Sequence, residues 1–348
     1  PAWSLSPPMF PRRRLLILCA ACAACAAPVG AFELTITVSS PHLFTANQLA
    51  IVNTAAAQAK AMWESAIIGY QPGISIPQVP INIIPTNTGL ASASYSGTTT
   101  QGGFTLTTSG FVNLNTLEIE NFANWQGHGA NGLNFIDELI AHEIGHALGI
   151  GTLWIANGVY QFNTFQYTGQ YGVAAYQQEF DAAATFVPVE NAGSAGTQNA
   201  HWDQRMRSSP QEGDPTNPWV LDPRVGVVDP YGRDRAFELM TGAIDPDWIE
   251  PFLSRTTVQS MRDLGYVVAE FEDFNGDGIL DQTDRQWLLS NIGMTGLQVD
   301  SFRFGDVNRD RVVDWEDLRL WEAAAGIPEP SGAALVAAAM ALVALRRK

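Results

Sequence analysis

The chain has 348 residues, enough for one large domain with appended segments, and its hydrophobic content of 46% is ordinary for a globular protein. A formal net charge of −16 argues against the basic surface that nucleic-acid binding requires, so we expect no nucleic-acid partner. The three cysteines, Cys19, Cys22 and Cys25, share one short apolar segment and therefore predict no disulfide framework.

Residues 1–31 have the pattern of a secretory signal peptide. A basic stretch, Arg12–Arg14, precedes a short apolar run, and small residues follow up to Ala31. We therefore expect export, with a cleavage that leaves Phe32 as the first residue and removes every cysteine.

Regular patterns recur before residue 120. Residues 32–39 alternate like a strand, and residues 45–68 are rich in alanine and have helical spacing. Residues 76–84 predict a strand whose prolines favour the edge of a sheet. Residues 86–117, rich in Thr, Ser and Gly, predict short strands or a hairpin. These strands should lie on one side of a cleft, with the largely irregular residues 151–241 on the other.

Residues 134–151 contain the pattern His-Glu-x-x-His within an apolar helical repeat. His142 and His146 would lie one turn apart on the same helix face, so both imidazoles can reach one metal ion. Glu143 would lie beside the first histidine, where it can act on a metal-bound water. Two surface histidines on an amphipathic helix are the alternative. We favour a zinc site, because this pattern is rare by chance in a chain with only 5 histidines.

A catalytic zinc ion normally takes three protein ligands and one water. The commonest extended pattern places the third histidine at position 152, which is Thr152 in this chain. Three histidines and one carboxylate remain as candidates: His42, His128, His201 and Glu179. With zinc bound, Glu143 would take a proton from the activated water and pass it to the leaving amine.

Few regular signals follow the metal motif. Residues 171–180 predict a short helix, and the rest of the segment up to residue 241 has the composition of loops. A segment of that length without regular structure is usually functional in a compact domain. Residues 254–266 predict a helix with Ser254 as N-cap and Gly265 near its end.

Two loops near the C-terminus have the ligand spacing of EF-hand calcium sites. Acidic or amide side chains occupy positions 1, 3, 5, 9 and 12, and position 7 can offer its carbonyl. The predicted ligands are, in the first loop, Asp273, Asn275, Asp277, Ile279, Asp281 and Asp284, and in the second loop, Asp306, Asn308, Asp310, Val312, Asp314 and Asp317. Gly278 is the usual turn residue, whereas Arg311 replaces it in the second loop. We therefore expect one or two structural calcium ions, the second bound more weakly.

Residues 327–348 combine a Pro-Glu-Pro motif, a short apolar run and the basic end Arg346–Lys348. The apolar run is shorter than the about 20 residues of an ordinary bilayer span. The basic end would stay on the cytoplasmic side.

The metal motif and the segments after it resemble leishmanolysin and its bacterial relatives. The resemblance rests on residues 142–154, on His201-Trp202, on residues 238–242 and on residues 254–266, in that order. It implies a metzincin fold, peptidase activity, His201 as the third zinc ligand and Met240 in a Met-turn beneath the zinc ion. The chain departs from the family because its mature part has no cysteine, and its N-terminal half shows no match.

Two further segments resemble known families. Residues 270–326 resemble a type I dockerin, because each calcium loop has Asp at position 12 and precedes one helix. This resemblance implies a cohesin-type partner; a calcium-stabilised spacer is the alternative. The tail resembles the PEP-CTERM sorting signal of Gram-negative bacteria. This resemblance implies transient anchoring in the inner membrane, exosortase-type processing and a final place at the cell surface or outside the cell. A simple C-terminal anchor is the alternative.

These patterns predict an α+β protein with a signal peptide at 1–31, a metzincin-like zinc peptidase domain at 32–268, a small all-α calcium module at 270–326 and a sorting tail at 327–348. The expected function is a secreted or surface-associated zinc metalloendopeptidase that hydrolyses proteins or peptides with one zinc ion and Glu143. A non-catalytic surface adhesin or scaffold and a zinc hydrolase for a non-peptide bond are the alternatives. The intact Glu143 favours an enzyme.

Overall fold

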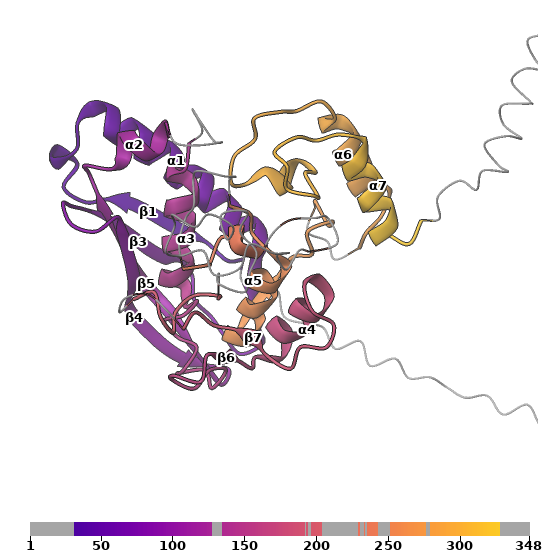
Figure 1. The fold of residues 1–348 in the computed structure, drawn as a ribbon, viewed down its shortest axis with the longest axis horizontal. Coiled ribbons are helices and arrows are strands. Elements are labelled where there is room, and N and C mark those ends of the chain that lie inside the picture. The colour runs from indigo at the N-terminus through magenta and orange to yellow at the C-terminus, as the bar shows by residue number, and fades with distance from the viewer. Residues whose placement is uncertain are drawn as a thin grey trace, which may run out of the picture.

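The computed structural model describes residues 31–126, 134–191, 193, 196–203, 229, 233, 235–242, 251–275 and 279–327. This part of the chain is α+β, as predicted (Figure 1). Its strands are β1 (Leu34–Val38), β2 (Ile67–Tyr70), β3 (Val79–Thr86), β4 (Ala91–Gln101), β5 (Phe104–Asn115), β6 (Gln166–Tyr167), β7 (Val187–Pro188) and β8 (Tyr266–Val268). Its α-helices are α1 (Ala46–Ala66), α2 (Ile119–Ala123), α3 (Ile136–Leu148), α4 (Gln170–Glu179), α5 (Arg255–Ser260), α6 (Gln282–Asn291) and α7 (Trp315–Ala324). Short 3-10 helices are η1 (Pro41–Leu43), η3 (Arg235–Phe237), η4 (Met261–Leu264) and η5 (Ser301–Phe304).

Several predicted features lie outside the described residues: the signal segment, His128, Asp277 and the tail from residue 328 onward. In the part that is described, no helix has both the length and the apolar character needed to cross a membrane.

The N-terminal half of the chain contains a four-stranded sheet. Strands β1, β3 and β5 are parallel, and β4 returns antiparallel to β5, in the order β1-β3-β5-β4. β4 and β5 form one long hairpin, where the sequence had left open short strands or a hairpin. Helix α3 packs against this hairpin, and α1 packs against both α3 and β1 (Figure 1). The sheet thus supports the helix that carries the predicted metal ligands.

The prediction that the proline-containing strand lies at an edge was wrong, because β3 lies between β1 and β5. The register explains why its prolines are tolerated. Pro80 pairs with Thr35 of β1 outside the stretch that pairs with β5, and Pro85 pairs with Leu114 of β5 beyond the end of β1. Each proline therefore lies where β3 has a neighbour on one side only, so its missing N–H need not interrupt a ladder.

Helices α1 and α3 form the centre of the main core. The Thr45 side chain caps α1 and accepts a hydrogen bond from the N–H of Gln48 in a capping box. All 13 residues of α3 are buried, so the alternative of two surface histidines is wrong. Trp63 of α1 donates its indole N–H to the carbonyl of Ala141 in α3 at 2.8 Å, which locks the two helices together.

The chain after α3 consists largely of loops with short elements. α4 coincides closely with the short helix predicted at 171–180. The helix predicted at 254–266 begins with Ser254 as its cap but tightens from α5 into η4. It ends at Gly265, whose φ of 97° is left-handed. Tyr266 then begins β8, which pairs with β2 directly after α1.

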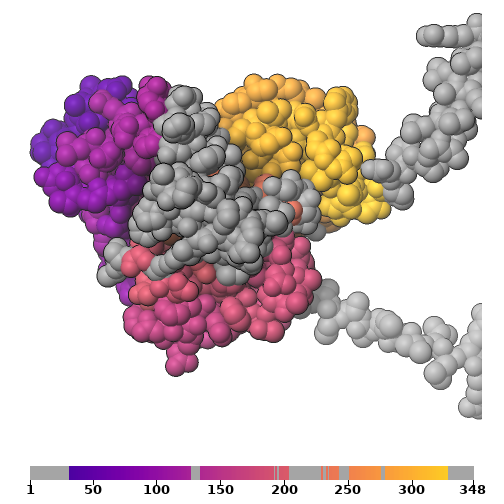
Figure 2. All heavy atoms as spheres, in the orientation of Figure 1, coloured from indigo at the N-terminus to yellow at the C-terminus, as the bar shows by residue number. Residues whose placement is uncertain are grey.

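The C-terminal unit, which comprises the described residues from 270 to 326, has a small core of its own. That core consists of Leu288, Leu297, Val307, Val313, Leu318 and Trp321. Val299 and Phe302, from the segment between α6 and α7, instead pack with Phe271 in the main core. Figure 2 shows the unit, in yellow and orange, as a lobe on one side of the molecule. The unit is therefore attached through packed side chains.

Candidate metal centre

Three histidines meet beside α3. His142 and His146 lie one turn apart on the helix, and His201 reaches them from the loop that follows β7. The Nε2 atoms are 3.0 Å apart for His142 and His146, 3.2 Å for His142 and His201, and 2.9 Å for His146 and His201. All three side chains are buried. The structure thus brings together the three residues that the leishmanolysin resemblance implied as zinc ligands.

A backbone carbonyl orients each imidazole through its other nitrogen. The Nδ1 atoms and their carbonyl partners are His142 with Leu239 at 2.6 Å, His146 with Ile150 at 2.9 Å, and His201 with Thr197 at 2.8 Å. Because a carbonyl oxygen can only accept, each Nδ1 carries the proton and each Nε2 keeps its lone pair. Three lone pairs therefore point toward one another, an arrangement that a bound cation relieves.

The charge state of the histidines suits a metal. Burial lowers the pKa of His142 to about 4 and that of His201 to about 3. Burial, and then the neighbouring His201 and His142, lower the pKa of His146 well below its ordinary value. The imidazoles are neutral at pH 7, the form that binds metals. Nitrogen ligands about 2.0–2.1 Å from a tetrahedral zinc ion lie about 3.3–3.4 Å apart, close to the separations found, so this donor set fits zinc.

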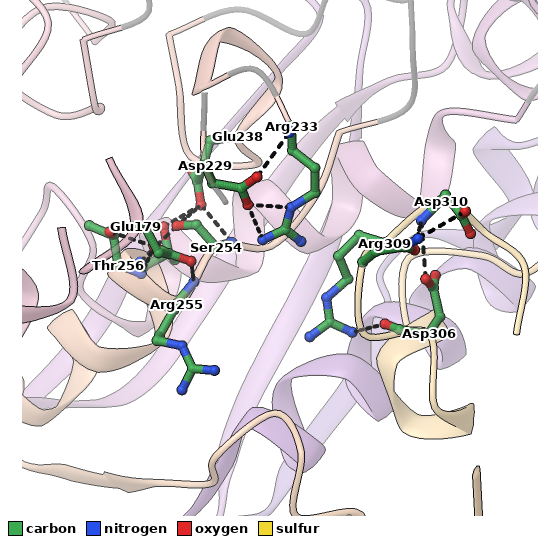
Figure 3. Close-up of polar contacts among 12 residues, drawn as sticks. Glu179, Asp229, Arg233, Glu238, Ser254, Arg255, Thr256, Asp306, Arg309 and Asp310 are labelled. Carbon is green, nitrogen blue, oxygen red and sulfur yellow. Dashed lines mark hydrogen bonds and ion pairs between the residues drawn. The ribbon is translucent and has the colours of Figure 1, made fainter. Parts of the chain in front are cut away.

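The other candidates for a third ligand lie elsewhere or are not described. Both oxygens of Glu179 cap α5, where they accept the N–H groups of Arg255 and Thr256 at 2.7 Å each (Figure 3). His42 is exposed on η1, and His128 lies outside the described residues. Among the described residues, one group of three or more His, Cys, Asp or Glu side chains has all its ligand atoms within 4.8 Å of one another. That group is His142, His146 and His201.

Glu143 follows His142 on α3 and is 6% exposed. Burial raises the pKa of its carboxyl group to about 8. Its Oε2 atom has no hydrogen-bond partner in the described part of the chain. In zinc-free protein this carboxyl group is therefore mostly protonated at neutral pH, and the positive charge of a zinc ion would lower its pKa toward the carboxylate form that accepts a proton.

Met240 is fully buried against α3. A Cβ atom added at Gly145 would lie 2.8 Å from the Sδ atom of Met240, so the methionine fits where the helix has no side chain. The N–H of Trp202 donates to the carbonyl of Met240 at 3.0 Å and joins the His201 segment to this turn. Sequence reasoning missed Gly145, although a glycine inside a helix is itself a signal of close packing.

Glu238 organises the turn that contains Met240. Its Oε2 accepts the N–H of Met240 at 2.6 Å, and its Oε1 accepts the N–H of Ser254 at 3.2 Å and the hydroxyl of Ser254 at 2.8 Å. The hydroxyl of Thr257 donates to the same oxygen. Burial raises the pKa of this carboxyl group. Glu238 therefore supports the turn whose Leu239 carbonyl holds His142; the sequence patterns placed Glu238 in this turn but predicted no role for its side chain.

Gly151 allows the His201 segment to return to the helix. Its φ is 72°, and a Cβ atom there would lie 2.2 Å from the carbonyl oxygen of Ala200. Any other residue would push away the residue directly before His201.

The two predicted calcium loops share one hydrogen-bond pattern. The Asp at position 12, Asp284 or Asp317, accepts the backbone N–H groups of positions 2, 3 and 9 of its own loop at 2.7–3.3 Å. The Asp at position 9, Asp281 or Asp314, caps the following helix. The same residue types thus perform the same local roles in both loops.

The second loop is described completely. Asp306 accepts the N–H groups of Asp310 and Arg311 at 3.0 and 3.1 Å, and Asp310 accepts the N–H of Val312 at 3.0 Å. No three carboxylates of this loop offer oxygens within 4.8 Å of one another. Asp306 and Asp310 thus hold the backbone of the loop in its turn.

Comparison with known proteins assigns no family. No protein-family model matches the chain, and no curated protein sequence matches it significantly. Its function is therefore inferred from the residues of the site.

Proposed function

We propose that this chain is a zinc metalloendopeptidase of the leishmanolysin-like metzincin type. The observation that carries the proposal is the meeting of three neutral, buried imidazoles next to a buried carboxyl group with a free oxygen. A zinc ion held by His142, His146 and His201 would polarise the scissile carbonyl and lower the pKa of a coordinated water to about 7.

The remaining steps belong to groups of the chain itself. The carbonyls of Leu239, Ile150 and Thr197 hold the imidazoles with Nε2 directed to the common point. Glu143 accepts a proton from the attacking water on its free Oε2 and returns it to the leaving amine nitrogen. Burial of the site excludes bulk water, which strengthens these interactions between charges.

Three features of the fold support the metzincin assignment. A sheet of parallel strands with the antiparallel edge strand β4 precedes the metal helix and packs against it. Gly149, whose φ is 124°, ends the helix, so the chain leaves the helix axis within one turn after His146. A methionine turn packs on the helix at Gly145. The edge strand can pair with an extended peptide, which fits an endopeptidase.

The same proposal extends to the other segments. The repeated hydrogen-bond pattern of Asp284 and Asp317 supports a dockerin-like module that binds one or two calcium ions at residues 270–326. A cohesin-type protein would be its partner. We also propose export to the surface of a Gram-negative-type bacterium, with transient anchoring through the tail and processing by exosortase-type machinery.

Metal analysis combined with a casein assay tests the proposed activity. The wild-type chain should bind zinc stoichiometrically and cleave casein, and a zinc chelator should abolish the cleavage. His201→Ala should lose most of the zinc, whereas His42→Ala, at an exposed position, should retain both zinc and activity. A chain that binds no zinc would refute the proposal. A zinc-loaded chain that hydrolyses only non-peptide bonds, or none, would favour one of the two alternatives.

A further inference from the structure

The C-terminal unit contacts the first turn of the metal helix α3. The N–H of Val299 donates to Oδ2 of Asp137 at 3.0 Å. Arg311 donates from Nη2 to Oε1 of Glu138 at 2.6 Å. Asp137 and Glu138 are both 0% exposed, and the Arg311 side chain is 13% exposed. The contact therefore lies inside the protein, where an ion pair is little screened by salt.

Glu138 lies one helical turn before His142, on the same face of α3. The Nη2 of Arg311 also donates to the carbonyl of Pro251 at 3.2 Å. The next residue, Phe252, accepts the N–H of Leu239 at 2.8 Å, and Leu239 holds the Nδ1 of His142. Arg311 thus contacts α3, which carries His142, and also Pro251. Pro251 precedes Phe252, which pairs with Leu239, the residue whose carbonyl orients His142.

Arg311 occupies position 6 of the second calcium loop, where glycine is the usual residue. Its φ of 69° is left-handed, a conformation that a side chain disfavours. Its N–H donates at 3.1 Å to Asp306, the first predicted calcium ligand of that loop. The loop conformation therefore sets the position from which the arginine reaches α3.

The loop is fixed to the main unit next to this contact. The guanidinium of Arg309 lies 4.2 Å from the ring centroid of Phe271 and 4.5 Å from that of Phe302, both residues of the main core. Arg309 also donates from Nη1 to the carbonyl of Asp306 at 2.8 Å (Figure 3). Trp321 of α7 donates its indole N–H to the carbonyl of Glu272 at 2.9 Å. The loop is therefore held against packed residues of the main core.

We propose that Arg311 is a positioning residue that couples the second calcium loop to the zinc site. Calcium bound by Asp306, Asn308, Asp310, Val312, Asp314 and Asp317 holds Arg311 on Glu138 and Pro251. The first turn of α3 and the turn at Leu239 are then ordered before zinc binds, so calcium raises the affinity for zinc. By thermodynamic linkage, zinc raises the affinity for calcium by the same factor. This inference rests on the proposed function in two respects, namely that the three histidines bind zinc and that the second loop binds calcium.

Two measurements on the full chain test the coupling. Zinc affinity is measured without calcium and at saturating calcium, by competition with a chelator selective for zinc. Hydrogen exchange of the α3 amides is measured on zinc-free protein under the same two conditions. In the wild type, calcium should tighten zinc binding about fivefold or more and slow exchange in α3.

The decisive variant is Arg311→Gly, which restores the usual residue of the loop and removes the side chain that reaches α3. It should bind calcium at least as tightly as the wild type, yet calcium should change neither its zinc affinity nor its α3 exchange. Arg319→Ala removes an exposed arginine of α7 that pairs with Glu316, and it should keep the full effect. Glu138→Gln removes the charge that pairs with Arg311. In this variant calcium should change zinc affinity and α3 exchange less than it does in the wild type.

The inference is overturned if calcium leaves both measurements unchanged in the wild type, or if Arg311→Gly keeps the full effect. A chain that shows calcium-dependent exchange in α3, lost in Arg311→Gly, but cleaves no casein would support the coupling while refuting the peptidase proposal. The two proposals can therefore fail separately.

Discussion

Gly145→Ala tests the packing of Met240 against the metal helix. Glycine inside a helix is less favourable than alanine, so an isolated helix would gain about 1 kcal/mol from this substitution. In the folded protein, the new methyl group would lie 2.8 Å from Sδ and 3.0 Å from Cε of Met240, and 3.0 Å from Cζ2 of Trp63. The helix term and the packing term therefore have opposite signs.

The packing term should be the larger of the two. Met240 and Trp63 are both 0% exposed, and adding a methyl group to a filled core costs about 1–3 kcal/mol. Met240 is flexible and can give way in part, whereas the indole of Trp63 is held by its hydrogen bond to Ala141. We expect a net loss of about 1 kcal/mol in the free energy of unfolding, together with weaker zinc binding.

Urea denaturation of the chelator-treated protein measures the first effect, and zinc titration measures the second. Met240→Ala alone should cost about 2–5 kcal/mol by leaving a cavity. In the double variant the new methyl group enters that cavity, so the combined loss should be smaller than the sum of the single losses. If Gly145→Ala stabilises the protein by about 1 kcal/mol, the helix term alone operates and the assigned contact with Met240 is absent.

Other variants separate the roles of single residues. Glu179→Gln should retain the full zinc content but lose about 1 kcal/mol of stability, because Glu179 caps α5. Loss of zinc in this variant would instead indicate that Glu179 is a zinc ligand. Glu238→Ala should cost about 3 kcal/mol and weaken zinc binding, because its buried donors lose their acceptor; unchanged zinc affinity in calorimetry would contradict this. In zinc-free protein, the pKa of His142 is about 4 and that of His201 about 3, both below the ordinary 6.5. Below pH 6.5 the unfolded chain binds protons that the folded chain does not. The free energy of unfolding should therefore be constant above pH 6.5 and decrease as the pH falls toward 4. The decrease should be about 1.4 kcal/mol per pH unit for each histidine. Urea denaturation at several pH values measures this decrease. On acidification His201→Gln should lose less stability than the wild type, and His42→Gln should lose as much as the wild type.

Local signals predicted the elements that carry the site. The apolar repeat around His142 and His146 defined a buried helix, and Ser254 marked the start of α5. Local spacing could not choose the third histidine. That choice depends on the path of a long loop, which the structure sets through the close approach of Gly151 to Ala200.

Long-range contacts account for what the sequence left undetermined. Proline statistics placed β3 at an edge, and only the offset registers of β1 and β5 show how an interior strand accommodates Pro80 and Pro85. Arg311 appeared in the sequence only as a departure from the calcium-loop pattern. Its partner Glu138 lies far away in the chain, so no local rule connects the two residues.

The most direct test of the zinc peptidase proposal compares wild type and Glu143→Gln on the same preparations. Zinc content and casein cleavage are measured together. We predict equal zinc content, because the three histidines remain, and cleavage slower by about 100-fold or more, because the amide cannot take up the proton. A Glu143→Gln variant that retains its zinc and cleaves casein at the wild-type rate would contradict the proposal.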